Sequence, residues 1–375
     1  MNQQEQRDGK SRLMMRGCAC GCEDTLSLTG STLSRRQFVA GAAGAATLAA
    51  TGLGLARPSL AQGAEKPYRV DVHHHLSPPT YIQAAIANNF GDGAQRNWTV
   101  EKSLADMDQA GIAISMLSVT QPGVNFTSGE TARKLARESN EYAAKLISDH
   151  PGRFGGFAML PLMDIDGSLK EITYALDTLK LDGIGLMTNY RDKWLGHPFF
   201  LPIMEELNRR KCVVYTHPAT ADCCVNMLPT EPPTLVEWGT DTTRTIGDIV
   251  FSGNAQKFRD IKWIFSHSGG TMPFLVERFV RQPMLEAKYK SAVPDGTLAE
   301  LTRFYYDTAQ TSNKAAMSAL TAIIPTSQIL FGTDFPYRTA IDHVKGLRSC
   351  GVFTEAQIMG IERGNAAKLL PRIGA

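Results

Sequence analysis

Two histidines at the end of one short segment are the first residues in the chain with the chemistry to bind a metal. Residues 68–75 read Tyr-Arg-Val-Asp-Val-His-His-His and are predicted to form a β-strand. Because side chains alternate across a strand, His73 and His75 point to one side and His74 to the other. Neutral imidazole is the commonest protein ligand for a divalent cation. A lone His-x-His pair is more typical of an ordinary polar strand end than of a metal site. A metal site therefore requires further ligands from other strand ends.

Strand-like and helix-like segments alternate through the chain beyond residue 66. Eight strands and eight helices in strict alternation indicate an α/β fold, a (β/α)8 barrel of the TIM type. A doubly wound open sheet shares this alternation, but no Gly-x-Gly-x-x-Gly follows the first strand. The predicted strands are 69–75, 112–118, 154–160, 183–188, 212–217, 261–267, 303–308 and 328–334. The predicted helices are 100–107, 128–149, 167–180, 198–210, 240–252, 273–290, 312–323 and 339–349, with a final helix near 354–370.

A barrel builds its active site at the C-terminal ends of its strands, and that rule brings distant residues together. His217, His267 and Asp334 end the fifth, sixth and eighth predicted strands, as His73 and His75 end the first. Each residue alone is more often a satisfied polar group than a ligand. Five such side chains at one rim indicate a site for metal binding and acid–base chemistry. The long loop 218–239 is expected to cover that site.

The composition excludes several classes of function. The 375 residues are 43% apolar and 20% charged, which is an ordinary globular mix for one large domain with an appendage. A net charge of +2 gives no broad basic surface for nucleic acid. No uninterrupted apolar run is long enough for a convincing membrane span.

The N-terminal residues 1–61 resemble a twin-arginine export signal. Arg35 and Arg36 precede a mildly apolar run, 40–56, and Ala61 ends a small-x-small cleavage site. The alternative is an N-terminal arm with a chance arginine pair. The order of the three regions favours export, so the catalytic domain is expected to span 66–375 and to reach the periplasm through the twin-arginine machinery. If this interpretation is wrong, the protein is expected in the cytoplasm.

Four motifs in the barrel region resemble those of the amidohydrolase superfamily, specifically the metal-dependent, non-oxidative decarboxylases typified by aminocarboxymuconate-semialdehyde decarboxylase. The resemblance spans roughly residues 69–370, and residues 135–161 also look familial. The first motif occurs throughout the superfamily, whereas the set in this order is specific to the branch. The motifs are Asp-Val-His-His-His at 71–75, Thr-His-Pro at 216–218, Ser-His-Ser-Gly-Gly at 266–270 and Gly-Thr-Asp-Phe-Pro at 332–336.

The resemblance implies that one divalent metal is bound by His73, His75, His217 and Asp334, with His267 beside it. Relatives with two metals bridge them with a modified lysine at the end of the fourth strand, and the predicted strand 183–188 has no lysine or acid there. Zinc suits the nitrogen-rich ligand set, with manganese as the alternative. A homodimer is also expected. The candidate substrate contacts are Arg278, acting across a dimer interface, together with Arg96 and Trp98. The alternative for Arg278 is an ordinary solvated arginine on a helix.

The expected reaction is the removal of CO2 from an aromatic or other unsaturated carboxylic acid, such as a hydroxybenzoate. His267 and Asp334 are the expected catalytic residues, because loss of CO2 requires a proton at the carbon that keeps the electrons. The chief alternative is a hydrolase that opens a lactone or amide with the same site. A second alternative is an exported metal-binding protein without turnover, and an acid–base residue at position 267 argues against it.

Overall fold

The computed structural model describes residues 68–374, which lie within one compact unit, Gly63–Ala375. The predicted export signal, 1–61, lies outside the described residues. Within the described part of the chain, no helix combines the length and apolarity needed to cross a membrane.

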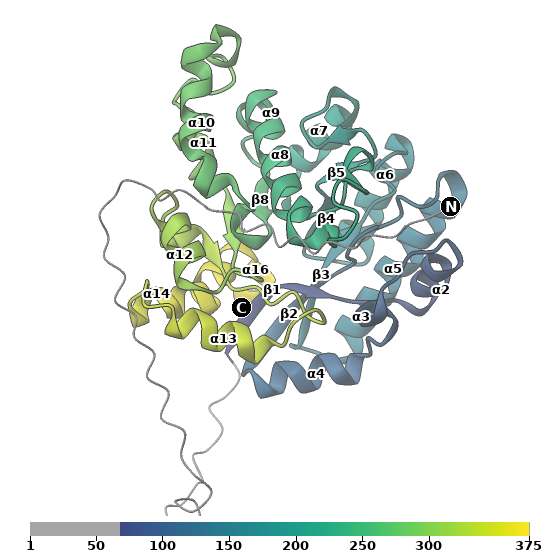
Figure 1. Cartoon of the computed structure of the whole chain (residues 1–375). Helices are drawn as coiled ribbons and strands as arrows, with labels where there is room; N and C mark the ends of the chain where they lie inside the picture. The colour runs from purple at the N-terminus through teal and green to yellow at the C-terminus, as the bar shows by residue number, and fades with distance from the viewer. Residues whose placement is uncertain (1–67, 375) are drawn as a thin grey trace, which may run out of the picture. The chain divides into compact units, whose positions relative to one another are not determined.

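Eight parallel strands form a nearly closed barrel surrounded by helices (Figure 1). Each strand pairs with the next along the chain, and β10 meets β1 across the remaining seam. There the backbone N–H of Asp334 donates to the carbonyl of His73 at 2.8 Å, and that of His75 donates to Phe335 at 2.9 Å. The barrel prediction is therefore confirmed. The strands are β1 (Arg69–His75), β2 (Ile112–Ser118), β3 (Phe154–Met159), β4 (Gly183–Met187), β7 (Val213–His217), β8 (Lys262–Phe265), β9 (Tyr305–Asp307) and β10 (Ile329–Leu330).

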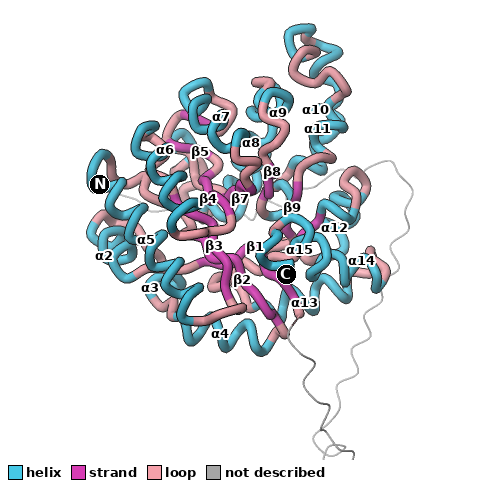
Figure 2. The backbone as a smooth tube through the Cα atoms, turned by 180° about the vertical axis from the view of Figure 1, so that it is seen from behind, coloured by secondary structure: helices cyan, strands magenta, loops and turns pink. Residues whose placement is uncertain are grey.

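The helices lie outside the strands, as the view from behind shows clearly (Figure 2). Their caps follow from the sequence; for example, Thr99 accepts a hydrogen bond from the backbone N–H of Lys102 where α4 begins. The helices α10 and α11 extend away from the barrel (Figures 1 and 2). The helices are α2 (Pro79–Ala87), α3 (Gly93–Arg96), α4 (Val100–Gln109), α5 (Gly129–Asp149), α6 (Ile165–Thr173), α7 (Leu201–Arg209), α8 (Glu237–Phe251), α9 (Asn254–Lys257), α10 (Met272–Leu285), α11 (Thr297–Leu301), α12 (Lys314–Thr321), α13 (Ala340–Ser349), α14 (Glu355–Met359), α15 (Asn365–Leu369) and α16 (Pro371–Gly374).

Several boundaries differ from the predicted ones for a backbone reason. The strands predicted at 261–267 and 328–334 end early, at Phe265 and Leu330. Neither strand can include its last predicted residue, because His267 and Asp334 have left-handed φ values of 52° and 61°, through which a strand cannot continue. Helix α2 was not predicted, nor was a short hairpin after β4, formed by β5 (Asn189–Tyr190) and β6 (Lys193–Trp194).

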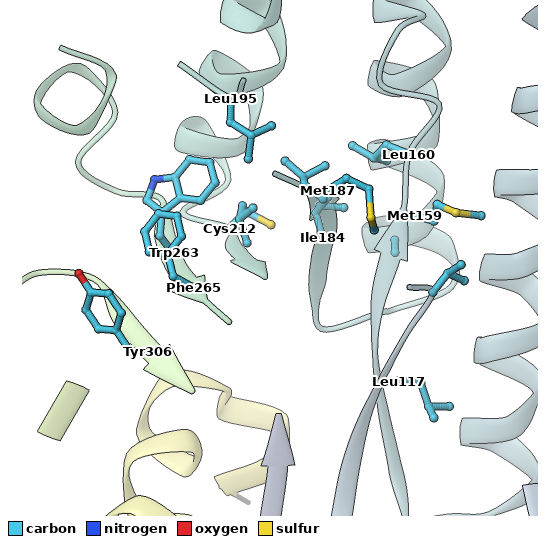
Figure 3. Close-up of a cluster of buried hydrophobic side chains, with 14 of the residues drawn as sticks. Leu117, Met159, Leu160, Ile184, Met187, Leu195, Cys212, Trp263, Phe265 and Tyr306 are labelled. Carbon is cyan, nitrogen blue, oxygen red and sulfur yellow. The ribbon is translucent and has the colours of Figure 1, made fainter. Parts of the chain in front are cut away.

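The main apolar core packs between the strands and the surrounding helices. Figure 3 shows part of it, with Trp263 and Phe265 from β8 side by side; their rings are nearly parallel, with centroids 5.9 Å apart. A second, smaller cluster joins strand residues such as Val70 and Tyr215 to Leu369 and neighbouring residues of α15 and α16. Because the strands are fixed by packing along their length, the side chains that follow them are held in place.

Candidate metal centre

The end of β1 places its three histidines as the alternation predicts. His73 and His75 point the same way, with their Nε2 atoms 3.1 Å apart. His74 points the other way, where its ring stacks on Phe335 at a centroid distance of 4.7 Å. Its Nδ1 lies 3.0 Å from an oxygen of buried Asp71. His74 therefore belongs to the packing between β1 and its neighbours and not to the cluster of site histidines.

The hydrogen bonds of three imidazoles set their tautomers. The Nδ1 atom faces an acceptor oxygen in each ring: Asp307 Oδ2 at 2.9 Å for His73, the Ser118 carbonyl at 3.3 Å for His75, and the Pro218 carbonyl at 2.8 Å for His217. An acceptor opposite Nδ1 keeps the proton there and leaves the Nε2 lone pair free. All three rings therefore present Nε2 as a metal donor.

Asp334 divides its two carboxylate oxygens between two sets of partners. Oδ1 lies 2.9 Å from His75 Nε2, 3.1 Å from His73 Nε2 and 3.9 Å from His217 Nε2. Oδ2 lies 3.4 Å from His267 Nε2 and accepts a hydrogen bond from Gln310 Nε2 at 3.0 Å. One oxygen is thus directed at the converging imidazoles, and the other is left for groups at the cavity surface.

His267 differs from the other histidines in its access to solvent. It is 8% exposed, whereas His73 and His217 are fully buried. The turn that carries it needs glycine, because a Cβ on Gly270 would lie 2.0 Å from the carbonyl oxygen of Gly239. Left-handed backbone at His267, Asp334 and Gln310 is energetically unfavourable, and such strain concentrates at functional sites.

The charges around the cluster favour a cation. Burial lowers the pKa of His73, but the negative charges of Asp307 and Asp334 outweigh burial and raise that pKa from 6.5 to about 10. Burial lowers the pKa of His75 and brings that of His217 well below 6.5. Burial opposes ionisation of Asp334, yet His73 and the other histidines hold its pKa well below 3.8. A divalent cation would meet the same two negative charges that favour a proton on His73.

The donor atoms have the spacing of a metal site. Ligands about 2.0–2.1 Å from one tetrahedral ion lie about 3.3 Å from each other, close to the separations among His73, His75 and Asp334 given above. Donor atoms of His73, His217, His267 and Asp334 also lie within 4.8 Å of one another. A metal-binding site of three histidines and one aspartate is therefore present. Because His75 and His267 both approach Asp334, the choice of fourth ligand between them stays a prediction.

Asp307, at the end of β9, is a site residue that the sequence analysis missed. It is fully buried, and its Oδ2 faces His73 Nδ1. Its Oδ1 accepts the backbone N–H groups of His267 at 2.9 Å and Ala309 at 3.0 Å. One carboxylate therefore orients a predicted metal ligand and also fixes the turn that carries His267. Its position at the end of the seventh predicted strand was the available signal.

We expect Asp307→Asn to weaken metal binding by about 10- to 100-fold. The two backbone N–H groups hold the amide oxygen at the Oδ1 position, which turns the amide NH2 toward His73 Nδ1. The ring must then accept there and carry its proton on Nε2, which removes the metal lone pair. Metal titration against a competing chelator measures the change. The control is Asp248→Asn, because the Asp248 carboxylate accepts a hydrogen bond from the Gly196 backbone N–H and not from a site histidine. Equal metal affinity in the two variants would contradict this account.

A cavity of about 760 Å³ adjoins the cluster. His267 and Asp334 line it, whereas the three more deeply buried histidines do not. The prediction that 218–239 covers the site is confirmed, because five residues of that range form part of the wall. Among the described residues, no lysine or arginine lines it. The lining is Asp92, Gln121, Pro232, Thr234, Leu235, Trp238, Gly239, His267, Gly270, Thr271, Gln310, Thr311, Asp334 and Tyr337.

The three predicted substrate contacts do not line this cavity. Arg96 is exposed, and its Nε donates to the carbonyl of Gly91 at 2.7 Å. Trp98 is buried with its ring against Tyr142. The capping box that starts α3 joins Asp92 to Gln95, and Asp92, not Arg96, lines the cavity. Arg278 is exposed on α10, so its role across a dimer interface stays a prediction.

Comparison with known proteins assigns the family. A family model described as amidohydrolase matches residues 70–372. The chain belongs to the amidohydrolase family. This amidohydrolase is 37% identical over 324 residues to decarboxylase yanB of Aspergillus niger, covering 81% of this chain and 88% of that protein. It is 33% identical over 325 residues to the 6-methylsalicylic acid decarboxylase acuB of Aspergillus aculeatus, covering 81% and 96%.

A solved structure shows the same fold. It is dihydroxybenzoic acid decarboxylase from Polaromonas sp. JS666 with bound manganese and the inhibitor 2-nitroresorcinol. The TM-score is 0.72 at 20% sequence identity, and the match covers 81% of this chain and 97% of that one. The family match and the identities of 37% and 33% to the two fungal decarboxylases confirm the predicted resemblance to the decarboxylase branch.

Proposed function

We propose that this amidohydrolase is a metal-dependent, non-oxidative decarboxylase of a hydroxybenzoate with a single carboxylate, such as 6-methylsalicylate. The observation that carries the proposal is a cluster of imidazole and carboxylate donors beside a cavity whose described lining contains no lysine or arginine. The relatives named as decarboxylases of hydroxybenzoates or 6-methylsalicylic acid support the substrate class.

The donor cluster supplies the place for the substrate carboxylate. A divalent cation held by the imidazoles and Asp334 would bind the carboxylate and its ortho hydroxyl and withdraw electron density from the ring. Because the described lining offers no other cation, that carboxylate is expected to be the substrate's only anionic group. Pro232, Leu235 and Trp238 give the cavity an apolar side that suits an aromatic ring with a methyl substituent.

The proton for the ring carbon has two candidate donors at the cavity surface, His267 and Asp334. The neighbouring histidines hold the pKa of Asp334 well below 3.8, so this group is a carboxylate before the reaction. It must first accept a proton, for example from the ortho hydroxyl of the substrate. His267 Nε2, beside Oδ2 of the same carboxylate, is placed to exchange that proton with Asp334. Tyr337 is a poorer donor, because burial raises its pKa and its hydroxyl already donates to Asp92.

Substrate selectivity tests the proposal. We expect 6-methylsalicylate to be decarboxylated with a kcat/KM about a hundredfold or more above that of 4-hydroxyisophthalate, which carries a second carboxylate that would be buried unpaired. Both acids are measured by CO2 release with the same enzyme preparation. Equal values for the two acids would contradict the proposed single-carboxylate cavity.

The metal and the assembly are proposed from the chemistry of the donor atoms and of the exposed surface. Three imidazoles and one carboxylate suit zinc, and the manganese of the Polaromonas decarboxylase makes that ion the alternative. We propose a homodimer, supported by exposed Phe274, Met284 and Leu285 on α10, the helix that also carries Arg278. Elemental analysis and the mass of the protein in solution test these two proposals.

We also propose export to the periplasm through the arginine pair. The catalytic unit begins at Gly63 and its first strand at Arg69, so cleavage after Ala61 would remove nothing that the described fold uses. Changing Arg35 and Arg36 together to lysine is expected to retain a folded, active protein in the cytoplasm, because the export receptor reads the arginines and not their charge. Fractionation with N-terminal sequencing measures this. Normal processing of the double-lysine variant would contradict the export proposal.

A further inference from the structure

A second cavity lies next to the metal cavity at the same rim of the barrel. Its volume is about 450 Å³, and the two cavities share Gln121 in their walls. The covering loop also contributes to both, with Pro232 in the metal cavity and Pro233 in the second one. We call the second one the outer cavity. A ligand in the outer cavity would therefore be separated from the metal cavity by a thin wall of side chains.

Arg191 is the only lysine or arginine among the described residues that line either cavity. It occupies the tip of the β5–β6 hairpin with a left-handed φ of 61°, and it is exposed. No hydrogen bond or ion pair joins its guanidinium to another described residue. Asp222, the single acid in the lining, forms no ion pair with it. Arg191 therefore has a guanidinium fork available for an anion.

Hydrogen bonds to one buried carboxylate hold the hairpin that carries Arg191 in place. Asp241 of α8 is fully buried and accepts hydrogen bonds from Thr188, from Asn189 at 2.7 Å and from the Trp194 indole at 2.8 Å. Asn189 also donates to the carbonyl of Ala219 at 2.7 Å. Because residues on both strands are tied to one carboxylate, the turn presents Arg191 at a defined place and loses little freedom when a ligand binds.

The outer cavity also offers an aromatic wall. Phe90 and Phe126 lie with ring centroids 5.7 Å apart, and Phe90 is 43% exposed. Exposed Val225 adds apolar surface from the covering loop. Leaving these side chains in water is unfavourable, and a flat apolar ring would cover them. Aromatic rings and a guanidinium in the lining of one cavity are complementary to the aromatic carboxylates.

We propose that the outer cavity is a second binding site for an aromatic carboxylate, with Arg191 as the partner of the carboxylate group. The inference rests on the proposed function in one respect: an enzyme that consumes such acids meets them at its rim. The metal cavity presents Asp92 and Asp334 and no lysine or arginine, so Arg191 is the nearest lining group that attracts the anion before it enters.

Binding stoichiometry on the metal-loaded, full-length enzyme tests this site. The probe is 3-fluorobenzoate, followed by fluorine NMR, because it lacks the ortho hydroxyl and is not expected to react. The wild-type chain is expected to bind two molecules and Arg191→Met one, with the outer site weakened about tenfold or more. Lys193→Met removes a neighbouring positive charge from the same hairpin and is the matched control; it is expected to bind two.

Three results would overturn the proposal: a single site in the wild-type chain, two undiminished sites in Arg191→Met, or loss of the outer site in Lys193→Met. Asp222→Asn is expected to tighten the outer site by removing the only acid, and weaker binding there would contradict the charge argument. Arg191→Asn, which tolerates the left-handed backbone, repeats the test if the methionine variant misfolds. Failure to release CO2 from any hydroxybenzoate would refute the proposed function without changing this stoichiometry.

Discussion

Replacement of His267 by alanine is expected to leave the metal bound and to lower kcat about a thousandfold. His267 lines the cavity and contacts the Asp334 oxygen that faces away from the three buried imidazoles. Removing it should therefore affect proton movement and leave the assembly of the metal site intact. Metal content of the purified variant and its CO2 release give the two readouts.

His267→Gln is the matched control for this expectation. Its amide nitrogen can take the place of imidazole Nε2 and donate to Asp334 Oδ2. Because an amide cannot carry a proton between two atoms, the activity of this variant should be as low as that of the alanine variant. If His267→Ala loses the metal as fully as a ligand variant does, His267 is the fourth ligand in place of His75. The approach of His267 and His75 to the two oxygens of one carboxylate makes this a direct comparison.

His75→Ala and Asp334→Ala are expected to lose the metal and, with it, all measurable turnover. The wild-type chain should hold one divalent ion. Asp334 Oδ1 lies within 3.1 Å of two imidazole Nε2 atoms, so its removal takes away a donor and the charge that balances the cation. His75 supplies a donor whose Nδ1 is already fixed by the Ser118 carbonyl. Elemental analysis after gel filtration measures the loss.

His74→Asn provides the control on the same strand. His74 is as buried as its neighbours, but it bonds Asp71 and packs on Phe335 instead of facing the cluster. Its replacement should lower stability and retain one ion per chain. Two tightly bound ions in the wild-type protein, or full metal retention without Asp334, would contradict the single-ion site.

The alternation of strands and helices was enough to predict the barrel and the convergence of the five site residues. His217 and Asp334 are far apart in sequence, and only the rule that strand ends share one rim joins them. The pattern could not give the left-handed backbone at His267 and Asp334, because those conformations are imposed by tertiary contacts such as the bond from the His267 N–H to Asp307. That conformation excludes both residues from the strands that were predicted to end with them.

The residues around the substrate were less predictable than the metal donors. Arg96 and Trp98 were selected from their chemistry, but Asp92, the N-cap of the four-residue helix α3, lines the cavity instead. Asp307 carried no local motif, and its importance follows only from the partners it meets across the barrel. Arg191 lies in a hairpin of two-residue strands, which is too short to produce a periodic signal.

The fate of the carboxylate in deuterated water tests the central claim most directly. The enzyme is incubated in D2O with 6-methylsalicylate labelled with carbon-13 in its carboxyl group, and gas and ring product are analysed together. Decarboxylation predicts labelled CO2 and 3-methylphenol in equal amounts, with one deuterium on the carbon that lost the carboxylate. No labelled CO2 from this acid or from other hydroxybenzoates, together with ring opening of a lactone by uptake of water, would contradict the account and identify a hydrolase.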